Sequence, residues 1–173
     1  MEKGFCIWLT GLSGSGKTTI AGKLREYFKE NRYIEVMDGD EIRKGLSSDL
    51  GFSKDDRNQH NRRVIFCSKL LARNGVIVVV ALISPYRETR AYAKEQIPNT
   101  IEVFVKAPLD ICIERDPKGL YKKALAGEIK QFTGIDDPYE EPLEPDLVLE
   151  TDKETVEDSL NKIIQKAREL GCL

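Results

Sequence analysis

A glycine-rich loop near the start of the chain constrains the fold more than any other feature. Residues 11–18 read Gly-Leu-Ser-Gly-Ser-Gly-Lys-Thr and fit the pattern G-x-x-x-x-G-K-[ST] without a mismatch. An apolar, β-prone run at residues 5–10 precedes this glycine loop, and residues 19–30 follow it with apolar side chains at helical spacing. Strand, loop and helix in this order predict a phosphate-binding loop, because glycines let backbone N–H groups turn inward and the helix N-terminus adds its positive dipole end.

The last two residues of the glycine loop predict the reacting end of a nucleoside triphosphate. Lys17 is placed to reach the β- and γ-phosphates, and the Thr18 hydroxyl is placed to ligate Mg²⁺. The alternative is a glycine-rich turn that merely opens a helix, but such a turn gives no reason for a lysine after its last glycine. We therefore expect the chain to bind a nucleoside triphosphate with Mg²⁺.

Length and composition predict one globular domain over residues 1–173. The net charge of −2 argues against nucleic-acid or anionic-membrane partners, and the apolar runs are too short for a signal peptide or a membrane span. The cysteines are scattered and only one histidine accompanies them, so a zinc site or a disulfide framework is not expected and a reduced cytoplasmic location fits. The four cysteines are Cys6, Cys67, Cys112 and Cys172.

Short apolar strands alternate with helices along the chain. This alternation predicts an α/β fold with three layers, in which helices flank a five-stranded parallel sheet. Ligands on such sheets bind at the carboxyl ends of the strands. The expected strands are 5–10, 33–37, 76–81, 100–105 and 147–149, and the expected helices are 19–30, 54–73, 88–96, 109–115 and 156–170.

Residues 116–145 interrupt this alternation, being rich in Pro, Gly, Lys and Asp and without a strong period. Long loops in compact domains are usually functional or disordered. We expect this segment to be a lid that closes over the nucleotide and excludes water, with a floppy insertion as the alternative. Residues 121–130 are expected to form a short exposed helix, and aromatic side chains among lysines suggest ligand contacts.

Charged residues near the strand ends suggest an anionic phosphoryl acceptor. Asp38 and Asp40 end the second strand, so one is a candidate general base and the other a Mg²⁺ ligand; the alternative is an Asp-Gly turn that caps the next helix. Arginine forks bind dianions, although about half of the arginines here are expected to lie merely on the surface. Phe52 either stacks on a base or packs under a turn. The arginines are Arg43, Arg57, Arg62, Arg63, Arg87 and Arg90.

Several segments together resemble the adenylylsulfate kinases (APS kinases), a family of P-loop kinases, from the first strand to about Asp152. The segments at 115–124 and 132–139 are specific to that family rather than common to kinases. Its members transfer the γ-phosphoryl group of MgATP to the 3′-hydroxyl of adenosine 5′-phosphosulfate (APS), giving 3′-phosphoadenosine 5′-phosphosulfate (PAPS) in sulfate assimilation. The matching segments are 38–46, 49–53, 56–57, 83–87, 115–124 and 132–139.

The resemblance implies roles for individual residues. Arg43 and Arg57 would clamp the phosphosulfate, and Phe52 and Phe132 would enclose the acceptor adenine. Asp40 would face the 3′-hydroxyl, and Thr18 and Asp38 would hold Mg²⁺. The implied catalytic residues are Lys17, Asp38, Asp40 and Ser84; those for ATP are Gly11, Leu12, Ser13, Gly14, Ser15, Gly16, Lys17, Thr18, Thr19 and Arg115; those for APS are Asp38, Asp40, Arg43, Phe52, Arg57, His60, Ser84, Lys118, Gly119, Leu120 and Phe132.

Two positions leave alternatives open. Family accounts describe the serine at Ser84 as a phosphoserine intermediate, but direct in-line transfer needs no covalent relay, so a Ser-Pro at a strand end serves equally well to position the backbone. His60 departs from the family, which has an asparagine there that is expected to touch the acceptor. An imidazole still donates one hydrogen bond, and it would add pH dependence to acceptor affinity near neutrality.

The resemblance also implies a homodimer and a functional pairing with ATP sulfurylase. A kinase for another small metabolite is the second hypothesis, which the arginine pair around Phe52 argues against because an uncharged alcohol needs no such clamp. A regulatory domain that binds nucleotides without transfer is the third, and the retained Lys17, Thr18 and aspartate pair argue against it. A switch GTPase is excluded because no N-K-x-D motif is present.

Overall fold

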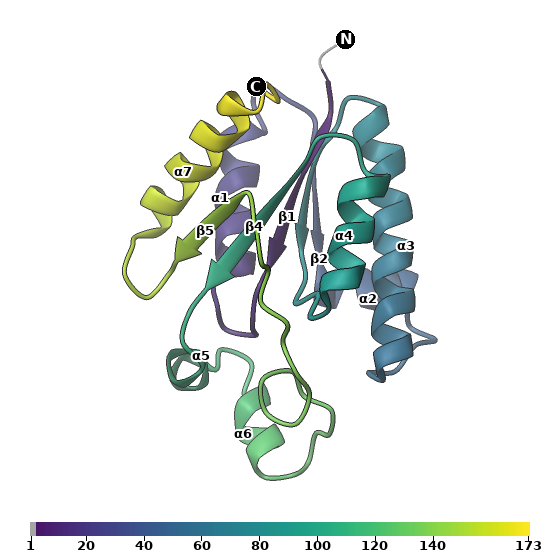
Figure 1. Cartoon of the computed structure of the whole chain (residues 1–173), viewed down its shortest axis with the longest axis vertical. Coiled ribbons are helices and arrows are strands. Elements are labelled where there is room, and N and C mark those ends of the chain that lie inside the picture. The colour runs from purple at the N-terminus through teal and green to yellow at the C-terminus, as the bar shows by residue number, and fades with distance from the viewer. Residues whose placement is uncertain (1–2) are drawn as a thin grey trace.

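The structure is a computed structural model that describes residues 3–173. Five parallel strands form one sheet in the order β2-β3-β1-β4-β5, with helices on both faces (Figure 1), as the sequence predicted. The strands are β1 (Phe5–Thr10), β2 (Ile34–Asp38), β3 (Ile77–Ala81), β4 (Thr100–Lys106) and β5 (Leu147–Glu150). The helices are α1 (Lys17–Phe28), α2 (Gly39–Leu46), α3 (Lys54–Arg73), α4 (Arg87–Gln96), α5 (Leu109–Arg115), α6 (Leu120–Leu125) and α7 (Val156–Glu169).

The central strands are apolar because both of their faces are covered. Every residue of β1 and of β3 is buried. On one face α1 and α7 pack through side chains such as Leu24 and Ile163, and on the other α3 and α4 pack through side chains such as Val64 and Ala93. Burial on both faces is typical of parallel sheets, and it leaves the ends of the strands as the place for a polar site.

Helix α2 was not predicted as a separate helix. It starts directly after β2, and the Asp38 carboxylate caps it by accepting a hydrogen bond from the Asp40 backbone N–H at 3.1 Å. Capping by aspartate satisfies an N–H group that has no partner within the helix. The capping interpretation of the Asp-Gly turn is therefore correct, and it leaves the other oxygen of Asp38 free for a second role.

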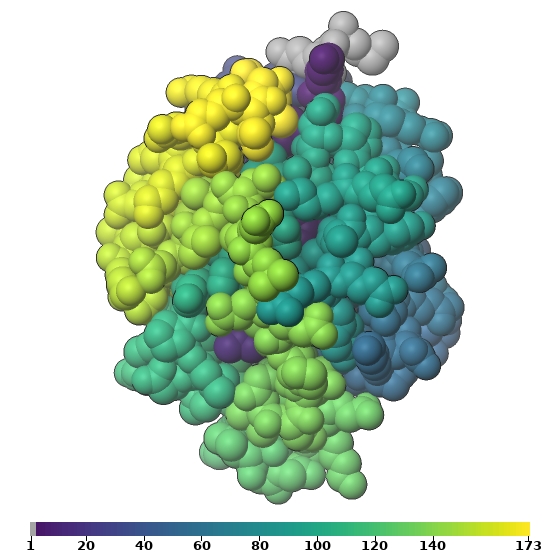
Figure 2. Space-filling model, in the orientation of Figure 1, coloured from purple at the N-terminus to yellow at the C-terminus, as the bar shows by residue number. Residues whose placement is uncertain are grey.

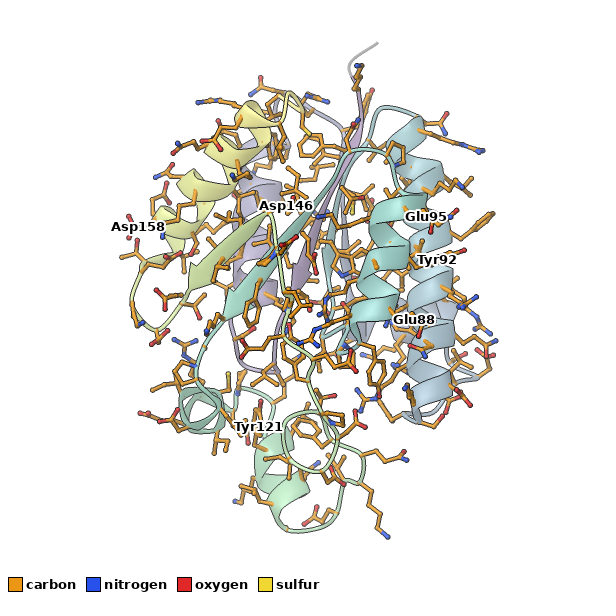
Figure 3. The ribbon with its side chains drawn as sticks, in the orientation of Figure 1. Glu88, Tyr92, Glu95, Tyr121, Asp146 and Asp158 are labelled. Atoms are coloured by element: carbon orange, nitrogen blue, oxygen red, sulfur yellow. The ribbon has the colours of Figure 1, made fainter. Side chains whose placement is uncertain are left out.

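The lid helix differs from the expectation of an exposed helix over 121–130. Helix α6 covers only Leu120–Leu125, between Gly119 and Gly127, whose positive φ angles of 65° and 77° delimit it. Tyr121 is fully buried and meets Phe132 edge to face at 5.0 Å between ring centroids (Figure 3). These two rings and Cys112 belong to a small separate hydrophobic cluster below the sheet, so the segment is packed rather than floppy.

A buried ion pair connects the sheet to the chain that follows the lid. Arg90 of α4 is 2% exposed and donates to Glu102 of β4 at 3.0 Å. The same guanidinium donates to the backbone carbonyls of Ser84 at 2.6 Å and Glu140 at 2.5 Å. In Figure 2 the yellow-green chain that contains Glu140 runs over the molecule between the yellow α7 and the teal α4. Arg90 thus binds both the β3–α4 loop and the chain near Glu140.

Within residues 3–173, no helix has the length and apolar character that crossing a membrane would require.

Replacement of Arg90 by Met is expected to lower the free energy of unfolding by about 3–5 kcal/mol, because Glu102 is then left charged and unpaired in the interior. Lys94→Met on the same helix is the matched control: its ion pair with Asp146 is half-exposed, and its loss is expected to cost about 0–1 kcal/mol. Urea unfolding of both variants measures the difference. An equal loss of unfolding free energy in the two variants would show that the buried Arg90–Glu102 pair contributes no more to stability than the half-exposed Lys94–Asp146 pair.

Candidate active site

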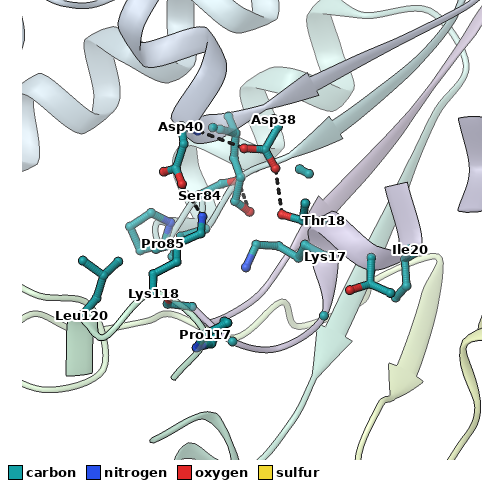
Figure 4. Close-up of a pocket in the computed structure, with 18 of the residues that line it drawn as sticks. Lys17, Thr18, Ile20, Asp38, Asp40, Ser84, Pro85, Pro117, Lys118 and Leu120 are labelled. Carbon is teal, nitrogen blue, oxygen red and sulfur yellow. Dashed lines mark hydrogen bonds and ion pairs between the residues drawn. The ribbon is translucent and has the colours of Figure 1, made fainter. Parts of the chain in front are cut away.

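One cleft of about 620 Å³ lies at the carboxyl ends of the strands (Figure 4). The glycine loop and the start of α1 form one wall, and the start of α2 with part of α3 forms another. The β3–α4 loop, residues 115–120 and residues 151–159 around the start of α7 also line it. The segments that sequence analysis selected separately therefore meet in one place.

The glycine loop presents backbone N–H groups to the cleft. Gly14 and Gly16 have φ angles of 77° and 104°, a region that side chains other than glycine rarely adopt. Gly16 is the N-cap of α1 and makes no side-chain capping bond. The first N–H groups of α1 thus face the cleft together with the positive end of the helix dipole, which is a binding site for an anion.

Lys17 is held within the loop. Its ammonium group donates to the carbonyl oxygens of Gly11 at 2.8 Å and Leu12 at 2.7 Å, and its side chain is largely buried. Burial lowers the pKa of Lys17 to about 8, since the charged form loses solvation. The Lys17 ammonium is still mainly protonated at pH 7. An anion beside it stabilises the charged form, which burial has deprived of solvation.

Thr18 and Asp38 place a hydroxyl oxygen and a carboxylate oxygen beside Lys17. The Thr18 hydroxyl donates to Asp38 Oδ2 at 2.7 Å, while Asp38 Oδ1 accepts the capping bond of α2. No group of three or more His, Cys, Asp or Glu residues suited to a metal occurs in the described part of the chain. A hydroxyl with a single carboxylate nevertheless fits Mg²⁺, which prefers hard oxygen ligands and is usually held by one or two carboxylates with water and phosphate oxygens.

Two of the six candidate arginines, Arg43 and Arg57, line the cleft. Arg43 lies over the Phe52 ring at 4.6 Å and donates to the Gly51 carbonyl at 2.7 Å. Arg57 donates to the Phe52 carbonyl at 2.8 Å and reaches the lid at Thr133 Oγ1 (2.9 Å). Its Nη2 also donates to the Gln131 carbonyl.

Of the other four arginines, Arg62, Arg63 and Arg87 lie at the surface, in line with the expectation for about half of the set, and Arg90 is buried in an ion pair. Arg63 forms a bidentate ion pair with Asp49, and Arg87 donates to the backbone carbonyl of Glu141. Arg62 lies over the exposed Tyr92, and Arg90 is committed to Glu102.

His60 is buried against α2 rather than exposed to solvent. Its Nδ1 lies 2.9 Å from Ser47 Oγ, and the residue is 4% exposed. Burial, and then the charges of Arg43 and Arg63, lower the pKa of His60 to about 4. The expectation that His60 titrates near neutrality is therefore wrong: the ring is neutral at physiological pH and acts as a fixed hydrogen-bonding group.

Asp40 and Ser84 both line the cleft. The Asp40 carboxylate pairs with the ammonium of Lys118 from the lid. Ser84 is 2% exposed and has a φ of 42°, and its hydroxyl oxygen accepts a hydrogen bond from the Trp8 indole at 3.0 Å. That bond occupies a lone pair of the hydroxyl, which favours the interpretation of Ser84 as a positioning element.

Most of the predicted site residues line the cleft, and a few do not. Phe132 is 8% exposed and belongs to the lid cluster, so its place beside the acceptor adenine stays a prediction. Gly11, Leu12, Ser15 and Gly119 support the loop and the lid from outside the cleft wall. The predicted residues on the wall are Ser13, Gly14, Gly16, Lys17, Thr18, Thr19, Asp38, Asp40, Arg43, Phe52, Arg57, His60, Ser84, Arg115, Lys118 and Leu120.

The sequence analysis missed cleft residues that lack a motif. Thr151, after β5, donates to the Ser15 carbonyl at 2.7 Å and accepts from Arg115 at 3.1 Å, which joins the end of the sheet to the glycine loop. Its place after the last strand of a parallel sheet was the only available signal. Asn61, one residue after His60, is 3% exposed and also lines the cleft.

The low pKa of His60 predicts a loss of stability at acidic pH. Below pH 6.5 the unfolded chain binds a proton at this residue and the folded chain does not, so the free energy of unfolding falls until the pH nears 4. We expect about 1–2 kcal/mol of extra loss between pH 7 and pH 5 relative to His60→Asn, which removes this titration. Urea midpoints of both proteins at the two pH values measure it, and parallel pH profiles would mean that the pKa of His60 is the same in the folded and the unfolded chain.

Comparisons with known proteins identify the family of the chain. The family model for adenylylsulphate kinase matches residues 3–150. The adenylyl-sulfate kinase of Rippkaea orientalis is 58% identical over 99% of this chain and 96% of its own. A probable bifunctional SAT/APS kinase 2 of Sorangium cellulosum is 53% identical over 97% of this chain, which spans 29% of that protein.

A solved structure gives the same result at the level of the fold. The Mycobacterium tuberculosis APS kinase, in complex with AMPPNP and APS, superposes with a TM-score of 0.92 at 42% identity, over 97% of this chain and 99% of its own. With its glycine loop, aspartate pair and arginine-flanked cleft, the chain belongs to the adenylylsulphate kinase family.

Proposed function

We propose that this protein transfers the γ-phosphoryl group of MgATP to the 3′-hydroxyl of APS, forming PAPS for sulfate assimilation. The observation that carries this proposal is a single cleft with two different anion sites. The glycine loop and Lys17 offer N–H groups and an ammonium to a triphosphate, and Arg43 and Arg57 flank the Phe52 ring on the acceptor side. An aromatic face between two guanidinium groups suits a ligand that has both a flat base and a dianionic group.

On the donor side, the chain supplies position and charge. The N–H groups of the glycine loop and the Lys17 ammonium hold the β- and γ-phosphates, and Thr18 with Asp38 would hold Mg²⁺. When bound, the metal ion neutralises negative charge on the phosphates. Arg115 and Thr151 lie at the outer side of the loop, where they support the nucleotide.

On the acceptor side, Asp40 is the proposed general base. Its carboxylate would accept the proton of the 3′-hydroxyl as that oxygen bonds to the γ-phosphorus and the bond to the β–γ bridging oxygen breaks, so that ADP leaves with the electron pair. Arg43 and Arg57 would hold the phosphosulfate, with Phe52 on the adenine. Ser84 would position the β3–α4 loop, since its hydroxyl is already bound by Trp8.

We further propose that residues 1–173 act as one domain with a lid at about 116–145. The continuous sheet supports the domain, and the separate cluster of Cys112, Tyr121 and Phe132 supports the lid. A homodimer and a pairing with ATP sulfurylase are also proposals, and the bifunctional Sorangium relative supports the pairing. The four free cysteines support a reducing, cytoplasmic location.

The proposed reaction predicts that the protein with MgATP and APS forms one PAPS for each ADP released. Lys17→Met is expected to lower kcat/KM at least about 100-fold, because the transition-state charge on the phosphoryl group loses a fixed cation. Chromatography of the nucleotides measures both products. Turnover of another alcohol together with none of APS would contradict the assigned acceptor.

Arg57 is expected to act mainly on APS. Arg57→Met should raise the KM for APS about 10- to 100-fold, the loss of a charge-assisted contact of about 1.5–3 kcal/mol, with a smaller change in the KM for ATP. Arg73→Met removes the same charge from the exposed end of α3 and should leave both KM values unchanged. Thr133→Val removes one of the two contacts of Arg57 with residues 131–133 and leaves the guanidinium in place; an equally large rise in that variant would assign the effect to this contact instead of the acceptor.

A further inference from the structure

The two aspartates of the cleft are held in different ways. Asp38 binds Thr18 and the N-terminus of α2, which are both fixed parts of the sheet edge. The Asp40 carboxylate instead accepts from Lys118, which lies 78 residues further along the chain at the start of the lid. Figure 4 shows Lys118 reaching across the cleft toward Asp40 and Ser84. The candidate base is therefore held by the part of the protein that covers the cleft.

This ion pair has the strength of a reversible contact. The side chains of Lys118 and Asp40 are 47% and 63% exposed. Exposed pairs are worth about 0.2–1 kcal/mol, in contrast to buried pairs, whose disruption costs several times more. A second anion that enters the cleft beside the triphosphate would add the charge that draws the Lys118 ammonium away from the carboxylate.

The position of the pair affects which nucleophile is activated. With ATP alone in the cleft, water is the available acceptor. Hydrolysis would form a bond from the water oxygen to the γ-phosphorus, break the bond to the β–γ bridging oxygen with ADP taking the electron pair, and pass a water proton to a nearby base. An ammonium bound to Asp40 Oδ2 occupies the oxygen that would receive this proton.

We propose that Lys118 is a positioning residue that blocks the Asp40 carboxylate until an anionic acceptor enters the cleft, and that it thereby suppresses transfer of the phosphoryl group to water. This proposal rests on the role of Asp40 in the proposed function. The phosphosulfate of the acceptor attracts the ammonium, Asp40 is released, and the 3′-hydroxyl arrives at the same moment. The acceptor thus unblocks the base that activates it.

The test is the rate of ADP release from MgATP without APS. Lys118→Met in the full chain is expected to raise this rate about 2- to 5-fold, the range that a contact of up to about 1 kcal/mol gives. With limiting APS, the variant should release more ADP than the PAPS it forms. Lys118→Arg keeps the ion pair and should restore the low rate.

Two controls separate the proposal from a general loosening of the lid. Lys123→Met removes an exposed charge from α6, away from the cleft, and should leave the rate unchanged. In the Asp40→Asn background, Lys118→Met should give no increase, because no carboxylate is left to release. An unchanged rate in Lys118→Met, or an increase that persists without the Asp40 carboxylate, would overturn the proposal. Because these rates need no APS, failure of the assigned acceptor would appear separately as absence of PAPS.

Discussion

The burial of β1 on both faces is the constraint on which the site depends. Helices cover both sides of this central strand, so its apolar faces carry no polar site, and the backbone turns through the glycine loop into α1 at its carboxyl end. The N–H groups of that turn have no partners within the helix, so they face the cleft. The apolar core and the phosphate site therefore depend on the same arrangement. Packing holds β1 in place, and the position of β1 sets the direction of the loop N–H groups and of the α1 dipole.

Asp38, at the carboxyl end of β2, makes two contacts that serve different purposes. One oxygen of Asp38 caps α2 and the other meets Thr18, so a single side chain sets the start of a helix and also belongs to the pair that would hold Mg²⁺ in the proposed function. The capping and functional interpretations of this aspartate are compatible. At Ser84, Trp8 binds the hydroxyl and Arg90 binds the carbonyl, which favours the interpretation of this residue as a positioning element.

Most of the fold and much of the cleft could be predicted, because they depend on local patterns. The glycine loop, the five strands and α3 carry short-range signals that tertiary packing reinforces. The partners of the arginines could not be predicted, since a helix sequence does not tell whether Arg90 meets Glu102 or a ligand. The prediction that His60 titrates near neutrality was wrong for the same reason. Burial against α2 lowers its pKa, and the sequence analysis did not predict α2 as a helix. Thr151 was missed because its contacts with the glycine loop join positions more than 130 residues apart.

The hydrophobic cluster around Tyr121 has a consequence for any movement of residues 116–145. Tyr121 and Phe132 pack edge to face, and Cys112 of α5 belongs to the same cluster. The Tyr121 hydroxyl also donates to the Ser13 carbonyl of the glycine loop, so this segment is packed against α5 and joined to the phosphate-binding end of the sheet. Opening of the proposed lid would therefore expose apolar surface as well as break polar contacts, and the free energy of each cycle would include both costs.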